Sequence, residues 1–90
     1  MRISEEKKTK ISEHILSFLY SISPRSAFVF NISKEVARDE EFIKKLLHNL
    51  KAKGLVLEIR KNPKGKEYRR RSRWKLSDQA YHAYKNVNNS

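Results

Sequence analysis

Sixteen residues, Arg60–Lys75, carry most of the net charge of this chain, and they have the sequence RKNPKGKEYRRRSRWK. Nine of them are Lys or Arg and one, Glu67, is acidic, so this stretch holds +8 of the chain's formal net charge of +11. The segment Asn62–Gly65 has the residue types of a type I turn, with Pro at its second position and Gly at its fourth. The stretch therefore predicts a strongly basic β-hairpin.

The second strand of this hairpin, Tyr68–Lys75, has two chemically different sides, because successive side chains of a strand point in opposite directions. One side carries cations alone: Arg69, Arg71, Arg73 and Lys75. The other side carries Tyr68, Arg70, Ser72, Trp74 and Leu76. We expect the hairpin to bind phosphate groups by its cationic side. Its aromatic residues alternate with the cations, which favours packing in the core over stacking on bases.

The composition favours one small globular domain with a polyanionic partner. Of 90 residues, 38% are hydrophobic and 34% are charged; we expect a single domain over residues 1–90, with its core at about 4–87 and a frayed tail at 88–90. A sequence pI near 10.1 predicts attraction to DNA, RNA or an acidic membrane surface. No apolar run approaches the roughly 20 residues of a membrane span and no signal-peptide core is present, so we expect a cytoplasmic protein.

Few residues suggest catalysis or metal binding. The absence of cysteine removes disulfides and thiolate ligands. The three histidines, His14, His48 and His82, lie too far apart for ligand spacing, and two glycines leave little material for a phosphate-binding loop. We therefore expect no enzyme activity, no cofactor and no metal.

Apolar periodicity and capping residues predict three helices. The first begins after Ser4 and ends before Pro24, the second begins after Asp39 and ends at Gly54, and the last begins after Ser77. The stripe of the first helix is Ile11, Ile15, Phe18, Leu19 and Ile22. The stripe of the second is Phe42, Ile43, Leu46, Leu47 and Leu50. The stripe of the last is Ala80, Tyr81, Tyr84 and Val87.

Shorter elements are expected between these helices. Ala27–Phe30 is a run of β-forming residues and predicts a short strand. Asn31 is a candidate cap for a short helix through Arg38. Its buried side would hold Ile32, Val36 and Ala37. Leu55–Ile59 predicts the strand that leads into the basic turn.

The resulting order of helix, strand, helix, helix, hairpin and helix resembles the winged helix-turn-helix domain of prokaryotic and archaeal transcription regulators. Three features carry the resemblance over about residues 11–85. Leu47–Val56 is similar to the end of the recognition helix and the start of the wing, Asn62–Gly65 occupies the wing tip, and Trp74–Ser77 is similar to the step into the final helix. The resemblance implies an α+β fold with a three-helix core, a two- to three-stranded antiparallel sheet bearing the basic wing, and a C-terminal helix.

One feature departs from that family. Regulators of this kind commonly place several residues between the end of their second helix and the cap of their third. Here only Arg38 separates Ala37 from Asp39. Either this turn is unusually tight or the short helix that begins at Asn31 ends before Arg38.

The resemblance implies sequence-specific binding of double-stranded DNA by a small transcriptional regulator. Helix 39–53 would lie in the major groove, and the wing 60–75 would lie on the phosphate backbone or in the minor groove. The candidate nucleic-acid-binding residues are Lys44, Lys45, His48, Lys51, Lys61, Lys64, Lys66, Arg69, Arg71 and Arg73. Glu41 either accepts a hydrogen bond from cytosine or, like Glu40, stabilises the first turn of the helix.

Other partners remain open at this point. The basic hairpin also suits an RNA- or ribosome-associated winged domain, or an interaction module for an acidic protein. A homodimer formed through the first and last helices would match palindromic DNA sites. The Lys- and Ile-rich, Cys-free composition suits an archaeal or viral source.

Overall fold

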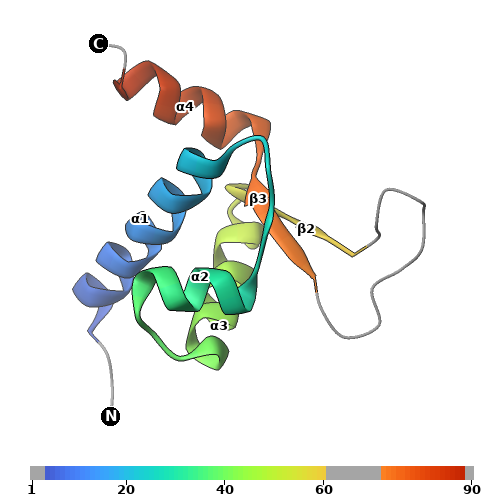
Figure 1. Ribbon diagram of the computed structural model, residues 1–90. Coiled ribbons are helices and arrows are strands. Elements are labelled where there is room, and N and C mark those ends of the chain that lie inside the picture. The colour runs from blue at the N-terminus through green and yellow to red at the C-terminus, as the bar shows by residue number, and fades with distance from the viewer. Residues whose placement is uncertain (1–3, 61–71, 89–90) are drawn as a thin grey trace.

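The computed structural model describes residues 4–60 and 72–88 of the chain, and it has the expected α+β order of elements (Figure 1). Three helices are followed by a hairpin and a C-terminal helix. The elements are α1 (Glu5–Ile22), β1 (Ala27–Phe28), α2 (Val29–Val36), α3 (Glu40–Ala52), β2 (Val56–Ile59), β3 (Arg73–Leu76) and α4 (Asp78–Asn88). The predicted turn Asn62–Gly65, the start of the second hairpin strand, and the tail residues 89–90 lie outside the described residues.

The sheet has three antiparallel strands in the order β1-β3-β2. Trp74 of the central strand pairs with Ala27 on one side and Glu58 on the other. The predicted alternation is confirmed for the described part of the hairpin, since Trp74 and Leu76 are buried while Arg73 and Lys75 are only partly covered. The sheet closes the core against the helices. The largest fully buried side chains are Trp74, Ile15, Leu19, Ile32, Ile43, Leu47, Leu76 and Val56.

The segment around β1 and α2 differs from the prediction. The strand ends at Phe28 instead of Phe30, and α2 begins at Val29 without a side-chain cap, so Asn31 is an exposed residue of the helix and not its cap. Starting at Val29 places that side chain one turn before the buried Ile32, and it packs on the core. Burial of this apolar face outweighs both the β-propensity of the run and the capping preference of Asn31.

The end of α2 explains the short connection to α3. Ala37 is exposed, not buried as predicted, and has left-handed backbone angles of φ 56° and ψ 48°. The Arg38 N–H donates to the carbonyl of Ser33 at 3.0 Å, and the Ala37 N–H donates to that of Lys34 at 3.3 Å. This is a Schellman motif with Ala in the position usually held by Gly. The turn is tight because one left-handed residue reverses the chain.

Replacing Ala37 with Gly is expected to raise the free energy of unfolding by about 0.5–1 kcal/mol. A left-handed L-residue costs roughly 1–2 kcal/mol, and the greater freedom of Gly in the unfolded chain cancels part of that gain. Urea denaturation followed by circular dichroism measures the change. Ala83, which is exposed in the interior of α4, gives the control: Ala83→Gly should lower stability by up to about 1 kcal/mol. Equal losses in both variants would contradict the strain at Ala37.

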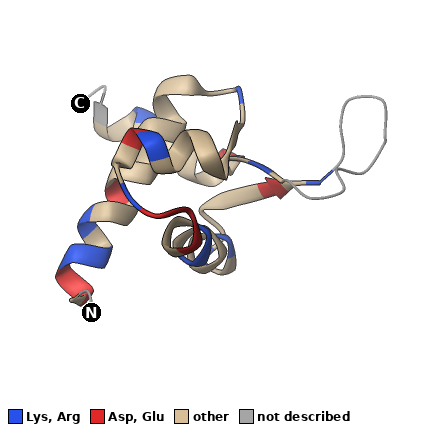
Figure 2. Cartoon of the chain, turned by 60° about the horizontal axis from the view of Figure 1, so that its bottom comes forward, with Lys and Arg blue, Asp and Glu red and all other residues tan. Residues whose placement is uncertain are grey.

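Helix α3 begins and ends where the sequence predicts. The Asp39 side chain accepts a hydrogen bond from the Phe42 N–H at 3.1 Å, and Gly54 follows the helix with a φ of 76°. The predicted stripe is confirmed, because Ile43, Leu46, Leu47 and Leu50 are buried and Phe42 packs against them. Figure 2 shows acidic residues in the segment that enters α3 and cations on the helix that follows.

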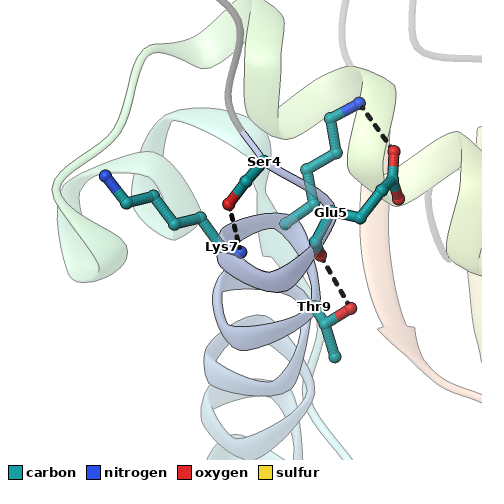
Figure 3. A network of polar contacts seen from close by, with 5 residues as sticks. Ser4, Glu5, Lys7 and Thr9 are labelled. Carbon is teal, nitrogen blue, oxygen red and sulfur yellow. Dashed lines mark hydrogen bonds and ion pairs between the residues drawn. The ribbon is translucent and has the colours of Figure 1, made fainter.

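Helix α1 is fixed at its start by polar contacts (Figure 3). The Ser4 hydroxyl accepts from the Lys7 N–H at 3.2 Å, as predicted for the cap, and the Thr9 hydroxyl donates to the Glu5 carbonyl at 2.9 Å. The buried face of the helix consists of Ile11, Ile15, Leu16 and Leu19. Leu16 adds to the predicted stripe, while Phe18 and Ile22 lie at its half-buried margin.

Helix α4 is tied to two other parts of the fold. The Ser77 hydroxyl accepts from the Ala80 N–H at 3.1 Å and donates to the Gly54 carbonyl at 2.8 Å, so one side chain caps α4 and anchors it beside the end of α3. The second contact is with α1. The ring centroid of Tyr20, near the C-terminal end of α1, lies 5.4 Å from that of Tyr81 and 5.6 Å from that of Tyr84.

Among the helices of residues 4–60 and 72–88, none has the length and the apolar character that crossing a membrane requires.

Candidate nucleic-acid interface

The exposed face of α3 carries four of the predicted nucleic-acid-binding residues: Lys44, Lys45, His48 and Lys51. Lys44, Lys45 and His48 are all exposed, because the residues between and around them point into the core. The imidazole of His48 lies edge-on to the indole of Trp74, with ring centroids 5.2 Å apart and an angle of 89° between the planes. This contact orients the His48 ring and places the exposed face of α3 directly beside the base of the hairpin.

The first turn of α3 has the opposite charge. Asp39, Glu40 and Glu41 are exposed, and the Asp39 carboxylate is occupied by its cap hydrogen bond. Acids at a helix N-terminus are stabilised by the helix dipole, which accounts for this position without any partner. The cationic surface of the helix therefore begins at Lys44.

A buried carboxylate joins the end of α3 to both strands of the hairpin. The side chain of Glu58 is 7% exposed. One of its oxygens accepts from the Lys51 ammonium at 2.9 Å, and the other accepts from the Ser72 hydroxyl at 2.6 Å. The guanidinium Nε of Arg60 lies 3.7 Å from the second oxygen. We call these four residues the Glu58 cluster.

Of the Glu58 cluster, only Lys51 was among the predicted site residues, although a pattern in the sequence pointed to Glu58. Val56 and Glu58 occupy the same phase of β2, so an acidic side chain faces inward next to a valine. The sequence alone does not show which residues contact Glu58. That depends on the pairing of Glu58 with Trp74, because Ser72 lies two residues before Trp74 and therefore on the same side of the sheet.

The pKa of Glu58 is lowered below its ordinary value of 4.5. Burial alone would raise the pKa of this carboxyl. The hydrogen bonds from Ser72 and Lys51, together with the charges of Lys51 and Arg60, more than offset that effect. The carboxylate is therefore ionised at neutral pH, and its contacts favour the folded state whenever it is charged.

Replacing Glu58 with Gln is expected to lower the free energy of unfolding by about 1 kcal/mol at pH 7, since charge-assisted hydrogen bonds become neutral ones. A carboxyl with a lowered pKa in the folded state stabilises the fold above pH 4.5, and this contribution is lost as the pH falls through the lowered pKa. The difference between the two proteins should therefore shrink below pH 4.5. Urea denaturation at several pH values measures it. A constant difference down to pH 2 would contradict the assignment.

Arg73 lies in a different environment from the cations of α3. Alternation along β3 places Arg73 and Lys75 on the sheet face opposite Trp74. The Arg73 guanidinium lies over the ring of Phe28, 4.9 Å from its centroid. Within the described residues its Nε is buried without a hydrogen-bond partner. The structure thus gives Arg73 a packing contact and does not bring it to the face of α3.

Five further candidates lie outside the described residues, in the segment that joins Arg60 to Ser72. They are Lys61, Lys64, Lys66, Arg69 and Arg71. Both ends of that segment belong to the Glu58 cluster and so start beside the end of α3. Among residues 4–60 and 72–88, no group of three or more His, Cys, Asp or Glu side chains is placed to hold a metal ion.

Comparison with known proteins finds matches among solved structures only; no protein family and no curated protein matches the sequence. The PcaV transcriptional regulator from Streptomyces coelicolor matches with a TM-score of 0.69 and 21% identity, over 92% of this chain and 57% of that chain. The S. aureus MepR–DNA complex matches with a TM-score of 0.70 and 19% identity, over 93% and 72%. The Zalpha domain of PKZ from Carassius auratus, in complex with Z-DNA, matches with a TM-score of 0.60 and 23% identity, over 78% and 97%.

These likenesses show the fold, which is a winged helix-turn-helix with a three-stranded antiparallel sheet. The expected fold class is thus confirmed. The chain spans 57% of the PcaV chain and 62% of the chain of a MepR mutant, which is less than two thirds of each.

Proposed function

We propose that this chain binds double-stranded DNA in a sequence-specific manner, as a small cytoplasmic transcriptional regulator with no catalytic role. Helix α3 would lie in the major groove. The basic segment 60–75 would lie on the phosphate backbone or in the minor groove. One observation carries the proposal: the exposed cations of α3 lie directly beside the base of a hairpin whose segment 60–75 holds nine Lys or Arg residues and one acid.

The charge of the segment 60–75 supports a polyanionic partner, and the fold of the chain supports duplex DNA as that partner. A segment with +8 of formal charge in sixteen residues is the electrostatic footprint of phosphate binding. The winged helix-turn-helix fold supplies a helix of suitable shape for the major groove. Two of the matching structures are described as a transcriptional regulator and as a protein–DNA complex, which favours the same partner for this chain.

We assign different tasks to the two parts of the interface. Lys44, Lys45 and His48 are the side chains of α3 that we place nearest the base edges, where Lys donates to guanine. The edge-on packing of His48 against Trp74 holds the imidazole in one orientation before DNA binds. Lys61, Lys64, Lys66, Arg69 and Arg71 are proposed to bind phosphates, with Arg73 at the margin of that set. Base contacts would therefore come from α3, and most of the affinity from the wing.

We further propose that the chain acts as a homodimer through α1 and α4. The Tyr20, Tyr81 and Tyr84 rings form a half-buried aromatic surface between these helices. Val87 of α4, which was predicted to complete an apolar stripe, is 72% exposed, so its apolar surface faces away from the core. A second copy packed here would relate two α3 helices by twofold symmetry, as a palindromic site requires.

A competition assay between two nucleic acids tests the choice of polymer. A labelled 24-base-pair DNA duplex of mixed sequence is bound by the protein at fixed salt, and unlabelled duplex or an RNA hairpin of equal phosphate number is added. The proposal expects the duplex to compete at least about tenfold better. With on the order of 6–10 phosphate contacts, affinity should fall roughly 10³–10⁵-fold between 50 and 200 mM salt. Stronger competition by the RNA would support the RNA-associated alternative instead.

A left-handed duplex is a second candidate, favoured by the match over 97% of the Zalpha domain that is bound to Z-DNA. A protein that prefers the left-handed form should invert the circular dichroism spectrum of an alternating dG–dC duplex when added in excess. An unchanged spectrum together with tight binding assigns the chain to right-handed DNA.

A further inference from the structure

The Glu58 cluster places a buried anion between the two cationic parts of the proposed interface. Lys51 follows His48 by one turn on α3, and Arg60 is the first residue of the basic segment 60–75. Both are candidate phosphate ligands by charge and position. In the structure, however, both contact Glu58. The Lys51 Nζ lies 2.9 Å from one carboxylate oxygen, and the Arg60 Nε lies 3.7 Å from the other.

Exposure differs sharply across the ion pair with Lys51. The Lys51 side chain is 49% exposed, whereas the Glu58 side chain is 7% exposed. The lysine can therefore turn outward to a phosphate, but the carboxylate cannot follow it. Losing the lysine would leave a buried carboxylate with a weaker set of partners, and such a loss is costly. The pairing thus resists the movement that DNA binding by Lys51 requires.

Ser72 keeps the carboxylate aimed at Lys51. Its hydroxyl donates to one carboxylate oxygen at 2.6 Å, which leaves the other oxygen directed at the ammonium group. Ser72 precedes β3 and Glu58 lies in β2, so the contact also joins the two strands where the hairpin leaves the sheet. The anion is therefore held in place before any nucleic acid arrives.

We propose that Glu58 is an intramolecular competitor of DNA phosphate for Lys51, a role that rests on the proposed DNA binding. It lowers affinity for duplex DNA of any sequence by about one phosphate contact. Contacts between bases and α3 are left unchanged, so specific and non-specific affinity fall by the same factor and their ratio stays the same. Glu58 therefore sets the strength and the salt dependence of DNA binding and leaves its sequence preference unchanged.

The experiment measures affinity for a 24-base-pair duplex of mixed sequence at 100 mM salt, for the wild type and for Lys51→Met, Glu58→Gln and the double variant. One phosphate contact contributes about 0.9 to the logarithmic salt slope, or roughly 8-fold in affinity at 0.1 M relative to 1 M salt. Lys51→Met should stay within about 2-fold of the wild type. Glu58→Gln should bind about 8-fold more tightly with a salt slope steeper by about 0.9, and the double variant should lose both gains.

Two control variants separate competition from general charge effects. Glu6→Gln, at an exposed position in the first turn of α1, raises the net charge as much as Glu58→Gln does and should change affinity by less than about 2-fold. Lys44→Met removes an exposed cation of α3 that has no partner among the described ion pairs. On a duplex of mixed sequence Lys44 is expected to act through attraction to phosphates, so its loss should weaken binding about 8-fold.

Three outcomes overturn the proposal. The first is a Glu58→Gln variant that is folded by circular dichroism but binds no more tightly than Glu6→Gln. The second is Lys51→Met losing as much affinity as Lys44→Met; this test remains available if Glu58→Gln fails to fold. The third is a folded wild type without affinity for the duplex, which also removes the proposed function. The first two leave that function intact.

Discussion

Replacing Trp74 with Ala is expected to lower the free energy of unfolding by about 3–5 kcal/mol. The side chain is 1% exposed and lies on the central strand of the sheet, between Ala27 and Glu58. Truncation removes the largest buried side chain and leaves a cavity that the surrounding backbone cannot fill. A domain of this size has roughly 5–13 kcal/mol of stability, so the variant should be close to unfolded at 37 °C. Urea denaturation monitored by circular dichroism measures the loss.

Trp74→Phe gives a matched control, because it keeps an aromatic ring and removes the indole N–H. Within the described residues that N–H is buried without a hydrogen-bond partner. Its removal leaves no acceptor stranded, and we expect a loss of only about 1–2 kcal/mol from the smaller ring. A loss below about 1 kcal/mol for Trp74→Ala would contradict the assignment of this residue to the core. Its burial also excludes base stacking by this ring in the structure described.

Reversing the charge of Arg69 and Arg71 together is expected to weaken binding to duplex DNA by on the order of 100-fold at 0.1 M salt. Each lost phosphate contact removes about 0.9 from the salt slope, and each new glutamate adds repulsion. The loss should be similar for every duplex sequence, because phosphate contacts carry no base information. Fluorescence anisotropy titrations at three salt concentrations measure both the affinity and the slope.

A double variant on α1 controls for net charge. Lys7→Glu with Lys10→Glu changes the formal net charge from +11 to +7, the same change as in the wing variant. Both lysines are exposed on α1, which we place outside the interface. This control should lose less than about 10-fold. Equal losses in the two double variants would show that overall charge, rather than the wing, provides the affinity.

Local sequence signals predicted most of the helices because each has its own start and stop residues. Ser4, Asp39 and Ser77 each accept the expected capping hydrogen bond, and Gly54 ends α3. These signals act within one turn of the chain and need no knowledge of the fold. The alternation of Trp74 and its neighbours in β3 was predictable for the same reason.

The errors lie where tertiary packing outweighs local preference. Val29 and Phe30 have the residue types of a strand, yet they begin α2 because the core needs an apolar residue one turn before Ile32. Ala37 takes a left-handed conformation that its own residue type disfavours, since α2 and α3 must meet within a very short connection. Neither feature has a signature in the adjacent sequence.

Only the part of the candidate site that depends on local sequence was predictable. Periodicity placed Lys44, Lys45 and His48 on the exposed face of α3, where the structure has them. The partners of Lys51 and Arg73 depend on strand register, which joins Glu58 to the end of α3 and sets Arg73 opposite Phe28. Register between segments so far apart is fixed by the packed sheet, and the sequence of one strand does not reveal it.

Selection of bound sequences from a pool of random duplex DNA measures sequence-specific binding by α3. The protein is incubated with the pool at 150 mM salt, and the retained DNA is sequenced over several rounds beside the Arg69→Glu/Arg71→Glu variant. We expect an enriched motif of two inverted half-sites whose centres lie about one helical turn apart, roughly 10 base pairs. The wing variant should retain far less DNA. Retention of DNA by the wild type without any enriched motif would contradict sequence-specific binding by α3.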